Sequence, residues 1–138
     1  MSAATPDPPP APALGVPTWS APVRYAEVDQ QGVVFNPHYL LYCDEAMGAF
    51  CLGRGLGDFV ERVRLKRSGQ TWHAAARWGD VVAVDARCTA VGRTSLTMVF
   101  EVGVGPRACC SVETVYVHTD AGGTPVPISE ADRAALAG

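Results

Sequence analysis

The chain has 138 residues, which is enough for one domain and too few for two ordinary ones. Hydrophobic residues make up 48% of the chain and charged residues only 18%, so it is apolar for its length. With 11 Lys and Arg against 14 Asp and Glu, the net charge is −3, and no basic stripe suited to a nucleic-acid backbone is present. We expect one domain, part of whose surface is covered by another copy of the chain.

The cysteines and histidines indicate a cytoplasmic protein without a metal site. The five cysteines form no C-x-x-C pair, and their odd number favours free thiols over a disulfide framework. The three histidines are scattered, so the short, regular ligand spacing of a zinc site is missing. We find neither the pattern of a secretory signal nor an apolar run of membrane-spanning length. We therefore expect a soluble protein that contacts no membrane.

The N-terminal segment differs in composition from the rest of the chain. Residues 1–22 contain seven of the eleven prolines, among Ala, Ser and Thr residues that have little apolar surface to bury. Proline also removes backbone donors and fixes φ. We predict a disordered or polyproline-like tail over residues 1–22, in which Trp19 is the first residue to dock, and a folded domain over residues 23–138.

A strand, a turn and a helix are predicted next. Residues 23–28 (VRYAEV) are β-branched and aromatic enough for a first strand, and residues 29–32 (DQQG) form a polar turn. Asn36-Pro37 is typical of a helix start, with Asn as the cap and Pro at the first helical position. Apolar residues then recur at spacings of three and four to about Leu52, beyond which three glycines end the predicted helix.

The rest of the chain predicts a series of strands, although residues 58–70 fit either a helix or the start of a strand. Period-two patterns predict four strands, over residues 70–78, 80–91, 94–104 and 107–118. Short turns that contain glycine separate them, so neighbouring strands must run antiparallel. One face of this sheet would pack on the helix, and the other would face water or a second subunit.

The order of the predicted elements and one sequence motif resemble those of a known family. Residues 24–39 read R-Y-A-E-V-D-Q-Q-G-V-V-F-N-P-H-Y. This segment resembles the 4-hydroxybenzoyl-CoA thioesterase type of hot-dog acyl-CoA thioesterases. The shared pattern is an acidic residue after the first strand, then x-x-G, an apolar triplet and a helix that opens with an aromatic residue. The later segments A-A-A-R-W-G-D and P-V-P-I-S-E-A-D-R-A-A-L are similar to the same family, so the resemblance covers roughly residues 22–136.

The resemblance implies an α+β hot-dog fold, in which a five-stranded antiparallel sheet wraps around a long central helix. It further implies a homo-oligomer: two protomers pair into a continuous sheet, and two such dimers stack as a tetramer. The active site would then lie at the dimer interface. The substrate implied is an acyl-CoA, or the thioester of an acyl carrier protein, and no cofactor is needed beyond the coenzyme A of the substrate.

The catalytic residues implied by the resemblance are Asp29 and Asn36. Asp29 would act as a nucleophile, which gives an acyl-aspartyl anhydride, or as a general base on water. The backbone N–H of Asn36, seven residues later, would stabilise the oxyanion, because a helix N-terminus offers free donors and a positive dipole end. Both roles of Asp29 stay open. Without the resemblance, Asp29 would be interpreted as a turn residue or a helix cap.

The predicted substrate-binding residues lie around this loop and at strand ends. Tyr39 and Trp72 are assigned to the acyl pocket, although core packing also explains Trp72, His73 and Trp78. Arg93 and Arg107 are assigned to the phosphates of coenzyme A, since the family binds them with basic side chains at the subunit edge. The substrate-binding set is Gly32, Val33, Tyr39, Trp72, Arg93 and Arg107.

Two other functions fit parts of the sequence. A hot-dog dehydratase or hydratase would need a catalytic His, but His38 lacks the D-x-x-x-x-H spacing of those enzymes, so we predict a packing or hydrogen-bonding role for it. Glu27 is a second carboxylate near Asp29 and is interpreted as a surface or interface charge. A non-catalytic module that binds acyl thioesters would gain nothing from a carboxylate beside the thioester.

Overall fold

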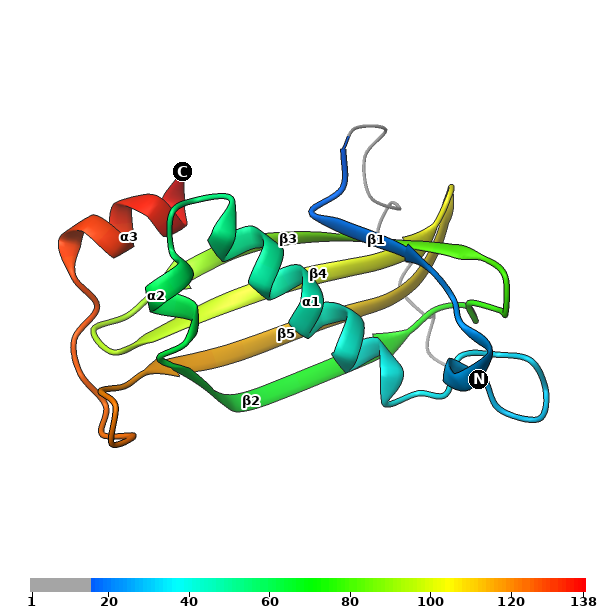
Figure 1. Ribbon diagram of the computed structural model, residues 1–138, viewed down its shortest axis with the longest axis horizontal. Coiled ribbons are helices and arrows are strands. Elements are labelled where there is room, and N and C mark those ends of the chain that lie inside the picture. Colours follow the sequence, from blue (N-terminus) through cyan, green and yellow to red (C-terminus); the bar gives the residue numbers. More distant parts are fainter. Residues whose placement is uncertain (1–15) are drawn as a thin grey trace, which may run out of the picture.

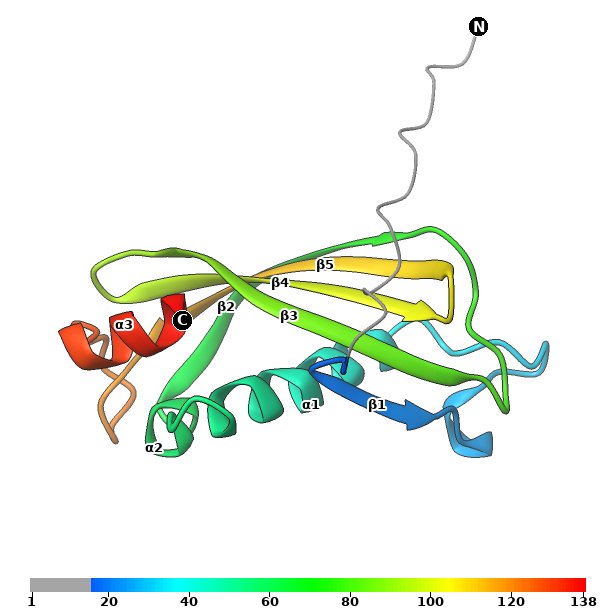
Figure 2. The same ribbon diagram turned by 90° about the horizontal axis from the view of Figure 1, so that it is seen from above.

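The computed structural model describes residues 16–138, so most of the predicted tail lies outside the described residues. A long helix, α1 (His38–Leu52), packs across one face of a five-stranded antiparallel sheet (Figures 1 and 2). The strand order is β1 (Trp19–Pro22), β3 (Val81–Val91), β4 (Ser95–Val104), β5 (Arg107–His118) and β2 (Val63–Trp72). The short elements are η1 (Tyr25–Glu27), a 3₁₀ helix, and the helices α2 (Gly57–Val60) and α3 (Glu130–Ala137). This is the hot-dog fold that the motif implies.

Alternation along the three long strands builds one side of the core. β3, β4 and β5 fall within one residue of their predicted bounds, and each strand pairs antiparallel with the next. Val84 pairs with Val102, and Ala86 with Phe100, so side chains of the same face meet across the strands. Four β4 side chains at alternate positions are buried: Leu96, Met98, Phe100 and Val102.

Helix α1 supplies the other side of the core. Its spacing of three and four puts seven buried side chains toward the sheet: Tyr39, Tyr42, Cys43, Ala46, Met47, Phe50 and Cys51. The helix ends at Leu52, as its sequence predicts, and Gly53 stands at the C-cap. Phe50 is 2% exposed, so its replacement by Ala would destabilise the fold by about 3–5 kcal/mol. The packing of α1 on the sheet therefore fixes the position of its N-terminus and of the loop that precedes it.

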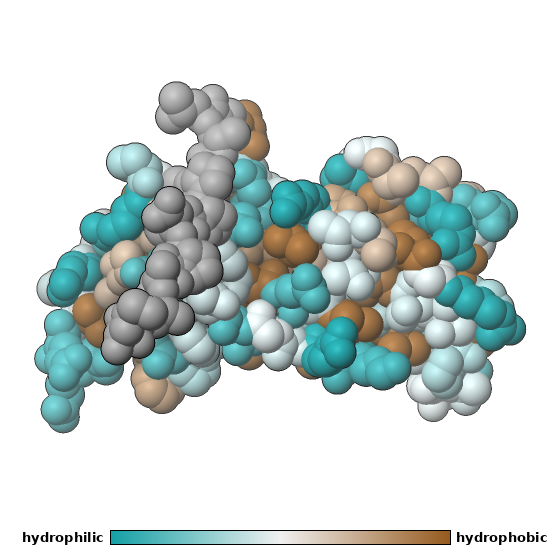
Figure 3. Space-filling view, turned by 180° about the vertical axis from the view of Figure 1, so that it is seen from behind, coloured by the Kyte–Doolittle hydropathy of each residue, from teal (hydrophilic) through white to brown (hydrophobic). Residues whose placement is uncertain are grey.

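The far face of the sheet is mixed in character. Figure 3 shows apolar side chains between polar ones on the side turned away from α1. Val99, Val115 and Val117 are only half-buried on their strands. Among residues 16–138, no helix is both long and apolar enough to cross a membrane.

The first strand is not where the sequence predicts it. Residues 23–28 hold η1 instead of a strand, because the Glu27 carboxylate folds back to accept the Arg24 N–H at 2.8 Å and closes a single turn. The strand lies earlier, as β1, which pairs with β3 and begins at Trp19. The predicted tail therefore extends too far, since its last four residues belong to the sheet.

The second strand is displaced as well. The sequence predicts it over residues 70–78, but β2 ends at Trp72, and residues 73–80 form a connection to β3. β2 begins at Val63, inside the segment that fits either a helix or a strand, and α2 precedes it. β2 lies at the edge of the sheet and most of its residues are exposed on both faces, so no alternating pattern marks it.

Candidate functional site

A tight hairpin places the two predicted catalytic residues. We call residues 27–36 the Asp29 loop. At its base, the Phe35 N–H donates to the Glu27 carbonyl at 2.9 Å, and one step further the Asp29 N–H donates to the Val33 carbonyl at 2.9 Å. At its tip, Gly32 has a φ of 77°, which favours glycine. Asp29 therefore lies on the outgoing leg, and Asn36 continues from the returning leg into α1.

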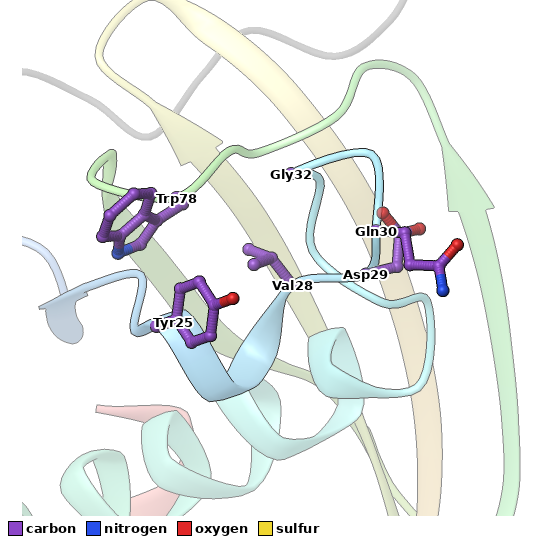
Figure 4. Close-up of a pocket in the computed structure, with 6 residues that line it drawn as sticks. All are labelled: Tyr25, Val28, Asp29, Gln30, Gly32 and Trp78. Atoms are coloured by element: carbon purple, nitrogen blue, oxygen red, sulfur yellow. The ribbon is translucent and has the colours of Figure 1, made fainter.

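The Asp29 carboxylate is exposed and makes few hydrogen bonds. One carboxylate oxygen accepts the Gln31 N–H at 2.8 Å, and this is its only hydrogen bond within residues 16–138. Such a turn fixes the side-chain direction and leaves the second oxygen available. Figure 4 shows the carboxylate pointing away from Tyr25 and Trp78. Asp29 can therefore act as a base or a nucleophile on a group that approaches from outside the protomer.

Asn36 lies in a turn rather than at the helix cap. α1 begins at His38 with Pro37 in the cap position, so the predicted capping role of Asn36 is wrong. The side chain of Asn36 is exposed, and within residues 16–138 its backbone N–H donates to no backbone carbonyl. This free donor lies next to the positive end of a 15-residue helix. An anion that develops near Asn36 would be stabilised there.

Two cavities flank the Asp29 loop. The first, of about 260 Å³, is lined by four predicted site residues together with the connection after β2: Val33, Val34, Asn36, Tyr39, Trp72, His73, Ala74 and Ala75. Tyr39 is buried, and its hydroxyl accepts the Ala76 N–H at 3.1 Å, which ties α1 to that connection. Trp72 is 47% exposed and borders the cavity, which argues against a pure packing role.

The second cavity, of about 490 Å³, opens on the other side of the loop (Figure 4). Asp29 and Gly32 border it together with Tyr25 and Trp78, whose rings meet edge to face at 5.4 Å. Trp78 is 61% exposed and Tyr25 is 74% exposed, so the predicted core packing of Trp78 is wrong. Both aromatic side chains offer flat apolar surface to a ligand or to another subunit.

The turn that carries Trp78 is tied to its neighbours by hydrogen bonds. The Asp80 N–H donates to the Arg77 carbonyl at 3.0 Å, and Gly79 takes a φ of 88° within the turn. The Trp78 N–H donates to the Gly32 carbonyl at 3.1 Å, which fixes the turn against the Asp29 loop. The turn that carries Trp78 and the Asp29 loop are therefore joined directly by a backbone hydrogen bond.

The two predicted phosphate-binding arginines do not lie together. Arg107 is near the site, since its guanidinium pairs with Asp80 at 2.7 Å in the turn that carries Trp78. Arg93 lies at the opposite end of β4, where its carbonyl accepts the Ile128 N–H at 2.9 Å near α3. The ten residues of β4 separate the two arginines by about 30 Å. Arg93 therefore does not share a site with Asp29 in one protomer.

Glu27 differs from its predicted surroundings, whereas His38 has the packing role that the sequence predicts. Glu27 is 6% exposed, so it is a buried carboxylate and not a surface charge. Burial alone would raise its pKa, but hydrogen bonds from Arg24 and Tyr42 lower the pKa below its usual value of 4.5. His38 is half-buried, packs edge-on against Phe35, and lines neither of the two cavities beside the loop.

Other chemistries find less support in the side chains. All five cysteines are free, and burial raises the thiol pKa of Cys51 to about 11 and that of Cys110 to about 12. These thiols stay protonated at neutral pH and are poor nucleophiles. Within residues 16–138, His, Cys, Asp and Glu side chains form no group of three that could hold a metal ion.

Four residues that border the second cavity are absent from the predicted site: Tyr25, Val28, Gln30 and Trp78. The sequence pattern assigns Tyr25 and Val28 to a strand, and Trp78 to the core. A signal for Trp78 exists, because an aromatic residue directly before a turn glycine stands at a corner of the chain, where its side chain is easily exposed.

Comparisons with known proteins show the family and the fold of the chain. The model of the family described as the thioesterase superfamily matches residues 31–110, which is more than half of the chain and begins two residues after Asp29. A thioesterase from Thermus thermophilus, crystallised with coenzyme A and Zn, has a TM-score of 0.79 at 26% identity, over 86% of this chain and 89% of that one.

Two further solved structures show the same fold. A hypothetical protein, also from Thermus thermophilus, is 30% identical with a TM-score of 0.77, over 86% of this chain and 95% of that one. A 1,4-dihydroxy-2-naphthoyl-CoA thioesterase from Synechocystis is 18% identical with a TM-score of 0.76, over 86% and 93%. A comparison with curated protein sequences finds no match. By fold and family match, this chain belongs to the thioesterase superfamily and is a thioester hydrolase.

Proposed function

We propose that the protein hydrolyses acyl-CoA thioesters, with Asp29 as the catalytic carboxylate and the Asn36 N–H as the oxyanion donor. The observation that carries this proposal is the Asp29 loop itself. One hairpin presents an exposed carboxylate with a free oxygen and, seven residues later, a backbone donor that is unused within residues 16–138. A thioester needs both groups, because a nucleophile must attack its carbonyl carbon while negative charge develops on its oxygen.

Two balanced routes lead to the same products. As a base, Asp29 takes a proton from water, the hydroxyl oxygen attacks the carbonyl carbon, and the C–S bond breaks to release the thiolate. As a nucleophile, an Asp29 oxygen attacks that carbon itself, the thiolate leaves, and water then hydrolyses the acyl-aspartyl anhydride. In both routes the thiolate takes up a proton, and the Asn36 N–H stabilises the oxyanion.

Coenzyme A as the thiol carrier is supported from two sides. The 26% identical thioesterase from Thermus thermophilus was crystallised with coenzyme A. Arg107 pairs with Asp80 in the turn whose Trp78 borders the second cavity, and exchange of Asp80 for a phosphate would let Arg107 bind the phosphate. The apolar walls formed by Trp72, Tyr25 and Trp78 suit an acyl group with a flat or apolar body.

The protomer alone leaves the site open, which favours a dimer. β2 is an edge strand of ten residues with exposed Leu65 and Trp72, and its outer edge has no partner within residues 16–138. A free edge of this length is a template for pairing with a second chain. We propose that two copies pair along β2, that two such dimers stack, and that the second copy closes the cavity bordered by Trp72.

Thiol release from a panel of acyl-CoAs, followed with a thiol reagent, tests the function. We expect hydrolysis by the wild type and by His38→Ala, and a loss of about 10²-fold or more in Asp29→Ala. The hydratase alternative predicts the reverse, with activity lost in His38→Ala. If the wild type binds acyl-CoA without releasing thiol, a binding module replaces the hydrolase.

A further inference from the structure

Glu27 is a buried carboxylate that the proposed reaction does not use. Its oxygens accept the Arg24 N–H at 2.8 Å, the Arg24 guanidinium at 3.0 Å and the Tyr42 hydroxyl at 3.0 Å. Charge is costly to bury unless donors of this kind compensate it. The chain nevertheless buries this charge two residues before Asp29.

The main chain of Glu27 forms the base of the Asp29 loop. Its carbonyl accepts the Phe35 N–H, and Phe35 directly precedes Asn36, whose own N–H is the proposed oxyanion donor. Glu27 therefore contacts both legs of the hairpin at the level of Asn36. Asp29 stands two residues further along the same leg.

Tyr42 links Glu27 to helix α1, and we call the hydrogen bonds of Glu27 with Arg24 and Tyr42 the Glu27 anchor. Tyr42 lies one turn beyond the start of α1, is 2% exposed, and stacks on Trp19 of β1 at 5.7 Å. Through its hydroxyl, Glu27 joins α1 to the loop base, and through Arg24 it holds the segment between β1 and η1. The Glu27 side chain thus connects the base of the Asp29 loop with α1 and with the segment between β1 and η1.

We infer that Glu27, through its hydrogen bond with Tyr42, is a positioning residue that sets the Asp29 carboxylate against the Asn36 N–H. The inference rests on the proposed function of those two groups. Glu27 borders a separate cavity of about 450 Å³ together with Trp19, Arg24 and Tyr42, and neither Asp29 nor Asn36 lines that cavity. Because Glu27 lines neither of the cavities that Asp29 and Asn36 border, we infer that it acts on these two groups through the backbone.

Stability alone is a weak explanation for this arrangement. The Arg24 side chain is 79% exposed, and exposed ion pairs contribute little to stability. A buried ionic group can often be replaced by apolar residues of similar volume without loss of stability. Reaction rates are far more sensitive, since a misplacement of about 1 Å in a catalytic group can cost about 10²-fold.

The test compares kcat and KM of acyl-CoA hydrolysis in a graded series. Glu27→Ala removes the anchor and should lower kcat about 10- to 100-fold, with KM within about twofold of the wild type. Tyr42→Phe removes one bond and should lower kcat about 3- to 10-fold. Glu27→Gln should stay within about 3-fold, because the amide oxygen accepts the same bonds from Tyr42 and the Arg24 N–H.

Thr114→Val is the matched control. Thr114 is 1% exposed on β5 and shares a hydrogen bond of 3.1 Å with Ser68, so its loss removes one buried polar contact in the middle of the sheet. We expect lower stability and an unchanged kcat, with all variants assayed below the onset of their thermal unfolding. If Glu27 had only a structural role, the Glu27 variants would behave like the control, with lower stability and an unchanged kcat.

Amide hydrogen exchange of the Phe35 N–H measures how firmly the base of the loop is held, and it needs no catalytic turnover. Glu27→Ala and Tyr42→Phe should speed exchange of the Phe35 N–H at least about 10-fold, and Thr114→Val should not. The inference is overturned if Glu27→Ala keeps the wild-type kcat or the wild-type exchange, if Glu27→Gln falls as far as Glu27→Ala, or if the control falls equally. Asp29→Asn in the same series tests the proposed function separately, since thiol release must fail there whatever Glu27 does.

Discussion

The base and the tip of the Asp29 loop handle negative charge in opposite ways. At the base, the Glu27 carboxylate is buried and accepts bonds from Arg24 and Tyr42. At the tip, the Asp29 carboxylate is exposed and accepts one bond from Gln31. The two side chains are two residues apart and chemically similar. We propose that the surroundings of each carboxylate decide its role, so that the satisfied one fixes structure and the available one reacts.

The substitution with the largest expected effect removes the backbone donor that we pair with Asp29 in the proposed reaction. Asn36→Pro deletes the backbone N–H that we assign to the oxyanion, and should lower kcat about 10²- to 10³-fold. Asn36→Ala keeps the backbone donor and should stay close to the wild type. Steady-state thiol release measures both variants, after circular dichroism confirms that each folds. A loss in Asn36→Ala equal to that in Asn36→Pro would assign the role to the side chain instead.

The next change concerns the tip of the loop. Gly32 has a φ of 77°, and no atom lies within 4 Å of the position of an added Cβ, so Gly32→Ala meets strain and not a clash. The left-handed backbone should reduce the free energy of unfolding by about 1–2 kcal/mol, measured by urea denaturation.

Gly48 provides the comparison for that experiment. It lies inside α1 with equal space for a Cβ, so Gly48→Ala should raise the free energy of unfolding by about 0.5–1 kcal/mol. Opposite signs for the two substitutions are expected. A stabilised Gly32→Ala would show that the tip does not adopt this turn.

The smallest effect concerns acid stability at the base. Hydrogen bonds to the Glu27 carboxylate hold its pKa below 4.5, so its contribution to stability is present above that pH and is lost as the pH falls through the lower, folded-state pKa. Glu27→Gln cannot titrate, and its stability should fall less steeply with pH below 4.5 than that of the wild type. Urea midpoints at a series of acid pH values measure this, and parallel curves would contradict it.

Much of the fold follows from sequence pattern because the interior strands have two distinct faces. β4 alternates with buried Leu96, Met98 and Phe100, and α1 repeats at three and four, so both elements were predictable. β2 was misplaced because an edge strand exposed on both faces has no alternation to detect. η1 was missed because a side-chain contact, Glu27 to the Arg24 N–H, overrides the strand propensity of its residues.

The candidate site was predictable only in part. Gly32, Val33, Tyr39 and Trp72, which the resemblance assigns to substrate binding, each border one of the two cavities, and their binding roles stay predictions. Arg93 and Arg107 stand near opposite ends of β4, and sequence alone does not show which end meets the loop of the same protomer. The phosphate-binding role of Arg93 stays a prediction. The anchor formed by Glu27 and Tyr42 joins residues 15 positions apart, and no local pattern announces such a contact.

The most direct test of the account is the rate of thiol release by Asp29→Asn beside the wild type, on the acyl-CoA that the wild type hydrolyses best. Asparagine keeps the size and the contact with Gln31 but cannot act as a carboxylate. We predict a fall in kcat of about 10²- to 10⁴-fold with unchanged unfolding behaviour. A folded Asp29→Asn that retains the wild-type rate would contradict the central claim and move the catalytic role away from the tip of the loop.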